Sequence, residues 1–105
     1  MSVGSNGERH YQLNLSADLQ ARLHRLHQRA SDEGRGPQFI HALETIVKRL
    51  EKAPSSHGDP LYRLATLRLV VYEIAIYPII VHYAVSDDLP IVYFKSVKLL
   101  SEKTL

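Results

Sequence analysis

The chain contains no cysteine among its 105 residues. This absence excludes a disulfide framework, a thiolate zinc site and a cysteine nucleophile. It also fits a reducing compartment such as the cytoplasm, which is the location that we expect. His24 and His27 are spaced as two metal ligands on one helix could be. No third histidine or matching carboxylate accompanies them, whereas a metal site needs three or four ligands, so we expect no metal.

Long apolar runs and the common catalytic motifs are also missing. The longest apolar stretch, residues 74–81, spans eight residues, whereas a membrane-spanning helix needs about 20. Residues 1–9 are polar, without the apolar core of a secretory signal, and are expected to form a flexible tail. The Gly-rich phosphate loops, the HExxH zinc motif and the GxSxG nucleophile motif do not occur. We therefore expect no membrane association and no cofactor.

The composition is that of one ordinary globular domain. Hydrophobic residues make up 45% of the chain and charged residues 23%, which is enough apolar material to bury a core. A chain of this length is too short for two independent cores, so we expect a single domain over residues 10–105. The formal charge of +2 permits RNA, DNA or acidic protein partners without selecting one.

The first part of the chain predicts a strand followed by a helix. Residues 10–15 alternate strictly between polar and apolar side chains, as a half-buried strand does. Ser16 follows as a candidate N-cap. Apolar residues then recur at helical spacing through Glu33, which predicts an amphipathic helix with one buried face.

A second amphipathic helix follows after a link of about three residues. We expect Gly34 and Gly36 to end the first helix and Pro37 to begin the second. Apolar side chains at helical spacing from Phe39 to Leu50 give the second helix its buried face. Because the link is so short, the two helices should run antiparallel.

The second half of the chain changes from helical to strand character. Residues 53–60 have the composition of turns throughout. Three segments rich in valine, isoleucine and tyrosine follow, at residues 67–76, 79–85 and 91–97. Such composition favours strands, and residues 62–64 could add a short fourth one.

Short links between these strands favour an antiparallel meander. Pro78 separates the first strand from the second, and residues 87–90 form the turn before the last. The fold class that we predict is α+β. It has an N-terminal strand, an antiparallel helical hairpin and then a three- to four-stranded, mostly antiparallel β-meander.

A sheet with helices on one side only leaves its second face exposed. In the last strand, Val92 and Phe94 should point to one face, and Tyr93 and Lys95 to the other. The second of these faces also carries Ile80 and His82, and it is largely apolar. Such a face indicates a partner-binding surface, although a tail folded back over it would give the same pattern. The predicted partner-binding residues are Ile80, His82, Tyr93 and Lys95.

Three local patterns accompany this order of elements. They are ALETIVKRL at residues 42–50 before a proline, PLYRL at residues 60–64, and the segments VHYAV (81–85) and IVYFK (91–95) across a short acidic turn. With them the chain resembles the RelE/ParE toxin superfamily over about residues 10–100. The resemblance implies a toxin of a type II toxin–antitoxin system, of the kind that serves plasmid stabilisation, neutralised by a small antitoxin.

Two activities are known in that superfamily. RelE-like members cleave mRNA on the ribosome, and ParE-like members bind DNA gyrase without nuclease chemistry. This chain departs from the nuclease pattern. Ile80 stands where a typical member carries an arginine, Leu99 and Leu100 stand where basic residues often end the last strand, and Tyr77–Pro78 replaces a glycine. RNA cleavage needs a cation at the phosphate and a general acid or base, which isoleucine and leucine do not supply.

We therefore predict a RelE/ParE-like protein that acts by binding, with an antitoxin-like protein as partner. The ribosome with its mRNA or DNA gyrase is the expected target class. The sequence leaves open whether the chain forms a homodimer. Two alternatives remain. The chain could be a ribosome-dependent mRNA endonuclease, or an interaction module that kept the fold and lost toxicity.

The endonuclease alternative depends on four candidate residues, Arg63, His82, Lys95 and Lys98. The resemblance implies a role in RNA contact for Arg63, and its plain alternative is a salt bridge or a solvated strand edge. His82 could act as a general base, because the ordinary pKa of histidine is about 6.5. No acid–base partner for His82 can be named from the sequence.

Cations on the two helices are candidates for nucleic-acid binding. Arg22, Arg25 and Arg29 share one helical face. They could build one phosphate-binding patch with three further residues, Lys48, Arg49 and Lys52. A solvated helix surface is the plain alternative.

Overall fold

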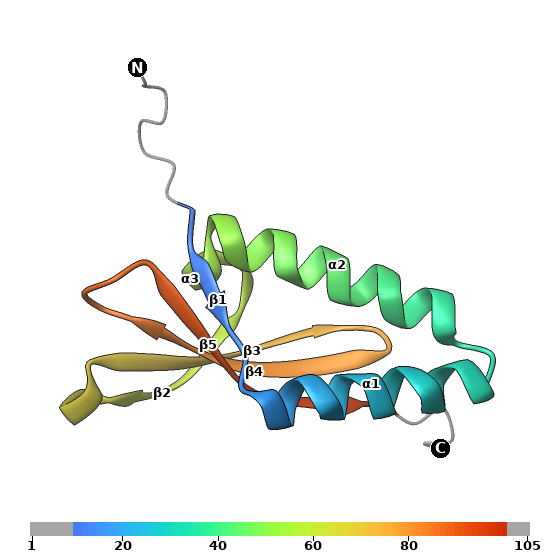
Figure 1. Cartoon of the computed structure of the whole chain (residues 1–105). Coiled ribbons are helices and arrows are strands. Elements are labelled where there is room, and N and C mark those ends of the chain that lie inside the picture. Colours follow the sequence, from blue (N-terminus) through green and yellow to red (C-terminus); the bar gives the residue numbers. More distant parts are fainter. Residues whose placement is uncertain (1–9, 101–105) are drawn as a thin grey trace.

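A computed structural model describes residues 10–100 and shows two long helices on one face of a five-stranded sheet (Figure 1). The elements, in chain order, are β1 (Gln12–Asn14), α1 (Ala17–Asp32), α2 (Gly36–Lys52), α3 (Pro54–His57), β2 (Asp59–Leu64), the 3-10 turn η1 (Ala65–Leu67), β3 (Leu69–Ile76), β4 (Ile79–Ser86) and β5 (Ile91–Leu99). The predicted α+β class is confirmed. The expected tail of residues 1–9 lies outside the described residues. Within residues 10–100, no helix is long and apolar enough to cross a membrane.

The helical hairpin begins and turns close to the predicted positions. Ser16 caps α1, and its hydroxyl oxygen accepts a hydrogen bond from the Leu19 amide at 3.1 Å. Gly34 adopts a left-handed conformation (φ +78°), which glycine allows at little cost. The prediction that Gly36 ends α1 is wrong, because Gly36 is the first residue of α2. A side chain there would press on Ser31, whose Oγ lies 2.7 Å from the position of an added Cβ.

The sheet has the strand order β1-β5-β4-β3-β2. The four later strands form the expected antiparallel meander, and β1 pairs with β5 in parallel. Because β1 spans only three residues, the edge of β5 extends beyond it. There α1 packs along β5, and Nε of Arg22 donates to the Val97 carbonyl at 3.1 Å.

Two boundaries of the second half differ from the prediction. Residues 53–60 are not turns throughout, because Pro54–His57 form the short helix α3 and β2 begins at Asp59. The segment expected as a strand from residue 67 begins as β3 at Leu69. Arg68 separates it from η1 with a left-handed backbone (φ 55°), which a strand does not accommodate.

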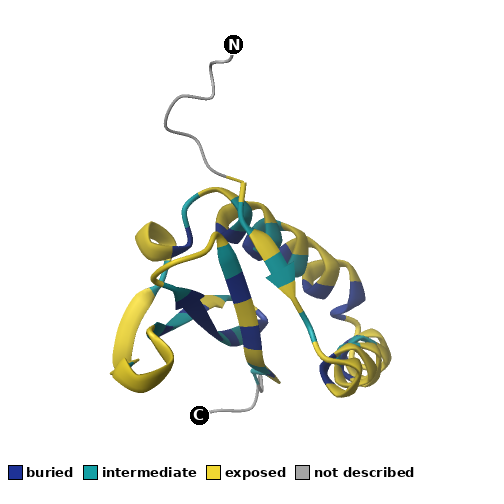
Figure 2. Cartoon of the chain, turned by 60° about the vertical axis from the view of Figure 1, so that its left-hand side comes forward, coloured by how far each residue is buried: buried dark blue, intermediate teal, exposed yellow. Residues whose placement is uncertain are grey.

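The core lies between the helical hairpin and the sheet. Figure 2 shows exposed residues on the outward side of both helices and buried residues on the side that faces the sheet. α2 contributes Phe39, Ile46 and Leu50, and the central strands contribute Val81 and Tyr83, all nearly fully buried. In β5, Val92 and Phe94 point into this core as predicted, whereas Tyr93 and Lys95 are exposed.

Candidate functional site

The face of the sheet turned away from α1 and α2, here called the open face, carries three cross-strand rows of side chains. The first row is apolar and runs over four strands, with Tyr62, Val71, Ala84 and Tyr93 in direct register. Val71 and Ala84 are buried, whereas Tyr62 and Tyr93 expose 49% and 36% of their surface. Two partly exposed tyrosines therefore flank a small apolar floor.

The second row is polar. Glu73 on β3 pairs with His82 on β4, and His82 pairs with Ser96 on β5. Nε2 of His82 lies 2.9 Å from Oε1 of Glu73. The two side chains are 33% and 37% exposed, so both remain accessible to a partner or substrate. We call these two residues the Glu73–His82 pair.

The third row and a bulge add lysines beside this pair. Ala75, Ile80 and Lys98 are in register across β3, β4 and β5. The pairing of β4 with β5 shifts between Tyr83 and His82, which leaves Lys95 as an extra residue on β5. Both lysines are exposed. Bulges often occur beside functional sites, where they redirect a side chain.

The structure thus places Ile80, His82 and Tyr93 on one open face, in three adjacent rows, with Lys95 at the bulge beside them. Their role in partner binding stays a prediction. The description of this face as largely apolar is incomplete. A polar row separates two rows that are mainly apolar, so the face offers both contact area and hydrogen-bonding groups.

Arg63 is not brought together with the other endonuclease candidates. It is paired with Val70, which in turn pairs with the core residue Val85. Residues in register share a face, so Arg63 lies on the helix side of the sheet at the β2 edge. Its guanidinium forms an ion pair with Asp87, which is the plain alternative considered for it. His82, Lys95 and Lys98 do gather on β4 and β5.

A second arginine–aspartate pair also involves the turn between β4 and β5. Nε and Nη2 of Arg68 donate to the two carboxylate oxygens of Asp88 at 2.8 and 3.0 Å. The hydrogen bonds from Arg68 hold the pKa of the Asp88 carboxyl below its usual value. Arg63 and Arg68 are therefore each paired with an aspartate of the turn that follows β4.

Glu73 is the site residue that sequence reasoning missed. A signal for it existed, because Glu73 and His82 stand at equal distances from the two-residue turn Tyr77–Pro78. In a hairpin with so short a turn, residues at equal distances are opposite each other. Counting outward from that turn would have identified Glu73 as the partner of His82.

The six helix cations predicted to form one patch lie along both helices, and their surroundings differ. Arg22 is bound to the Val97 carbonyl, and Arg25 and Arg29 are exposed on α1. Lys52 lies at the far end of α2, about 24 Å along its axis from Gly36, whereas Arg29 lies in the last turn of α1, next to the start of α2. That the six cations act as one patch stays a prediction.

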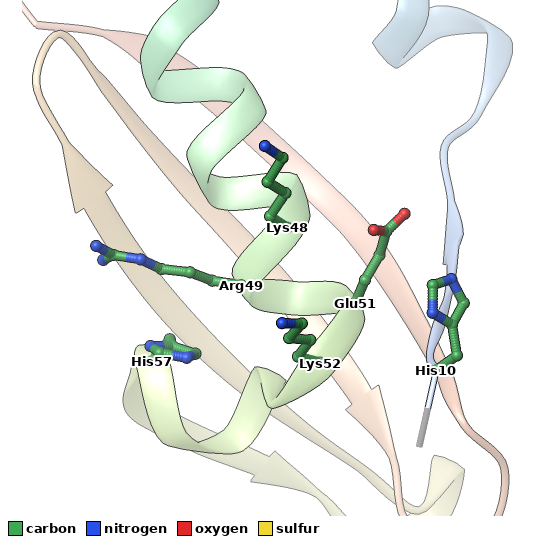
Figure 3. A pocket seen from close by; sticks show the side chains of 6 residues that line it. All are labelled: His10, Lys48, Arg49, Glu51, Lys52 and His57. Atoms are coloured by element: carbon green, nitrogen blue, oxygen red, sulfur yellow. The ribbon is translucent and has the colours of Figure 1, made fainter. Parts of the chain in front are cut away.

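Three of these cations surround a pocket at the end of α2. The pocket has a volume of about 260 Å³ and is lined by His10, Lys48, Arg49, Glu51, Lys52 and His57. Figure 3 shows Arg49 and His57 on one side of the helix, His10 and Glu51 on the other, and Lys52 between them. The amide of Tyr11 donates to the Glu51 carbonyl at 2.8 Å, which fixes the start of β1 against this end of α2.

His24 and His27 do not come together with a third possible metal ligand in the described part of the chain. Among residues 10–100, no group of three or more possible ligands comes together. The ring of His27 instead packs against Phe39, with 5.5 Å between ring centroids.

No protein-family model matches this chain, and no curated protein or solved structure shows significant similarity to it.

Proposed function

We propose that this protein is a toxin-fold protein of the RelE/ParE type that acts by binding a partner protein with the open face of its sheet. The partner that we propose is an antitoxin-like protein. The setting is a cytoplasmic type II toxin–antitoxin system, with the ribosome or DNA gyrase as the target class. The order strand, helical hairpin, meander, on which the resemblance rests, supports this proposal.

The observation that carries it is the open-face row Tyr62–Val71–Ala84–Tyr93, in which the two outer tyrosines are exposed and the two central residues are buried. No helix within the described residues packs over it, since α1 and α2 contribute to the core on the other side. Tyrosine gives a large contact area at low entropic cost and keeps a hydroxyl for hydrogen bonds, which is why it is enriched at protein interfaces. Glu73 and His82 next to this row supply polar groups that can select the partner.

A co-expression experiment tests the proposal. The chain is expressed with the product of the neighbouring short reading frame and captured by an affinity tag. Tyr93→Asp and Ile80→Asp place a charge on the open face and should abolish co-purification. Leu67→Asp is the matched control, because Leu67 is 64% exposed on η1, outside the open face, and it should leave co-purification unchanged.

Two results would contradict the proposal. One is equal capture by the wild-type chain and both open-face variants. The other is a chain that stays monomeric, captures nothing and has no effect on growth when expressed alone. Loss of capture by Leu67→Asp as well would place the contact elsewhere.

The Glu73–His82 pair specifically favours a second candidate, a ribosome-dependent mRNA endonuclease. His82 would accept the proton of the RNA 2′-hydroxyl, whose oxygen then attacks the adjacent phosphorus. The bond to the 5′-oxygen breaks, and that oxygen takes up a proton from water. Glu73 would orient the imidazole, and Lys95 and Lys98 would stabilise the charge on the phosphate.

This candidate makes predictions that binding alone does not make. His82→Gln keeps a hydrogen-bonding side chain but cannot act as a general base, so it should retain partner capture and lose translation arrest. Arg63→Ala should leave the arrest unchanged, because Arg63 lies on the other side of the sheet and is paired with Asp87. Arrest that persists in His82→Gln and disappears in Arg63→Ala would exclude this site.

A further inference from the structure

The pocket at the end of α2 gathers three cations that form no ion pair within the described residues. Within residues 10–100, the side chains of Lys48, Arg49 and Lys52 form no ion pair. Three arginines elsewhere, Arg35, Arg63 and Arg68, are each paired with an acidic side chain. The cations around this pocket are therefore available to an external anion.

The charge at this place exceeds what the helix end itself requires. The C-terminus of a helix carries about −0.5 of an elementary charge, and basic residues in the last turn commonly compensate for it. Three full positive charges against the single carboxylate of Glu51 leave an excess of two. The partial negative charge of the helix end opposes anion binding, but it is several times smaller than the excess of two positive charges.

We propose that this pocket binds the phosphate monoester group of a small ligand, such as a nucleoside monophosphate. Arg49 and His57 on one side and Lys52 next to them would surround the phosphate, and Lys48 would add charge at the rim (Figure 3). This site goes beyond the proposed partner-binding function, because the open face and the pocket share no residue.

Charge and shape both favour a monoester over a nucleic-acid backbone. A monoester carries about −1.5 to −2 charges at neutral pH, close to the excess of two around the pocket. A backbone phosphodiester carries one charge and repeats along an extended strand. A cavity of about 260 Å³ suits a compact group.

The test is a titration of the full chain, followed by amide chemical shifts at constant ionic strength. The probes are inorganic phosphate, a nucleoside monophosphate, the nucleoside without phosphate, and a short oligonucleotide without a terminal phosphate. Saturable shifts at Arg49, Lys52 and His57 are expected with the first two probes only. The double variant Arg49→Gln/Lys52→Gln should weaken binding about tenfold or more, as the loss of charge-assisted hydrogen bonds does.

The control is Arg25→Gln/Arg29→Gln, which removes the same net charge from exposed positions on α1. It should change the affinity less than about twofold. Equal weakening by both double variants would overturn the proposal, because binding would then follow net charge alone. Tighter binding of the oligonucleotide than of the monophosphate would also overturn it. The open-face variant Tyr93→Asp should bind phosphate normally, which separates this site from the proposed function.

Discussion

The imidazole of His82 on β4 and the carboxylate of Glu73 on β3 lie 2.9 Å apart on the open face of the sheet. Both side chains are about one-third exposed to solvent. Water screens such a pair, and exposed ion pairs contribute only about 0–1 kcal/mol to stability. The pair is therefore a weak structural contact at a position where it can meet a partner or substrate.

Conservative substitutions should separate function from stability at this pair. Glu73→Gln and His82→Gln should each lower the free energy of unfolding by less than about 1 kcal/mol. Urea denaturation of the purified variants measures this quantity. The same variants should differ from wild type in growth arrest or partner capture. A decrease of about 3 kcal/mol in the free energy of unfolding would instead show that the pair stabilises the fold, since breaking a buried ion pair has that cost.

Several residues of the open face could be predicted from the sequence. Alternation in β5 correctly separated Val92 and Phe94 from Tyr93 and Lys95. The turn at Tyr77–Pro78 also fixes the register of β3 against β4, so the opposition of Glu73 to His82 was within reach. Periodicity and turn length determine these features locally.

The side on which Arg63 lies could not be obtained in this way. Counting by twos from Asp59, which pairs with Glu73, would put Arg63 on the open face. The register of β2 shifts between Pro60 and Tyr62, which leaves Leu61 as an extra residue. One inserted residue moves every later side chain to the opposite face. No local sequence pattern indicates that bulge. The pocket at the end of α2 could not be predicted from a local pattern either, because its residues come from separate segments.

Gly58 is required by close packing, and its substitution should destabilise the fold. An added Cβ would overlap the Tyr83 hydroxyl and would lie 3.0 Å from Cζ of Tyr83 and 3.1 Å from the Glu73 carbonyl oxygen. Tyr83 is fully buried and cannot move aside. Gly58→Ala should therefore lower the free energy of unfolding by about 1–3 kcal/mol, measured by urea denaturation.

The Tyr83→Phe background provides the control for Gly58. Phenylalanine lacks the oxygen that an alanine side chain at Gly58 would meet first. Gly58→Ala should therefore cost less in that background, with a coupling energy of about 1 kcal/mol. Strictly additive effects of the two substitutions would show that the close approach is not what requires glycine.

Alkaline pH should destabilise the protein through Tyr83. Its hydroxyl donates to the Pro54 carbonyl at 2.7 Å, and burial, with contributions from Tyr72 and Asp59, raises the pKa of Tyr83 above its ordinary value. The folded state thus favours the neutral, protonated form. The unfolded chain releases this proton near pH 10, so stability is fully present below that pH and decreases above it.

The measurement compares the wild-type chain with Tyr83→Phe from about pH 9 to about pH 11. Near pH 9 the phenylalanine variant should be less stable by about 1–2 kcal/mol, because the Pro54 carbonyl loses its donor. The gap should narrow above pH 10 by up to about 1.4 kcal/mol per pH unit. A stability difference between the two proteins that stays constant over this range would show that Tyr83 does not cause the alkaline destabilisation.

Arg35 should be the most important charged residue for stability. It is 5% exposed, and within residues 10–100 it is the only buried charged side chain. Its Nη1 donates to the Leu100 carbonyl at 2.6 Å, and its guanidinium pairs with Glu33 and lies 5.9 Å from the ring centroid of Tyr77. Arg35 therefore ties the helical hairpin to the β3–β4 turn and to the end of β5.

Arg35→Met keeps the length of the side chain and removes its donors and charge. The Leu100 carbonyl then loses a charged donor, so the free energy of unfolding should fall by about 2–3 kcal/mol. Arg35→Lys should recover only part of this loss, because an ammonium cannot reproduce the planar guanidinium. Arg25→Met, at an exposed position on α1, should change stability by less than about 0.5 kcal/mol. Similar losses at Arg35 and Arg25 in chemical denaturation would show that Arg35 does not connect the two layers.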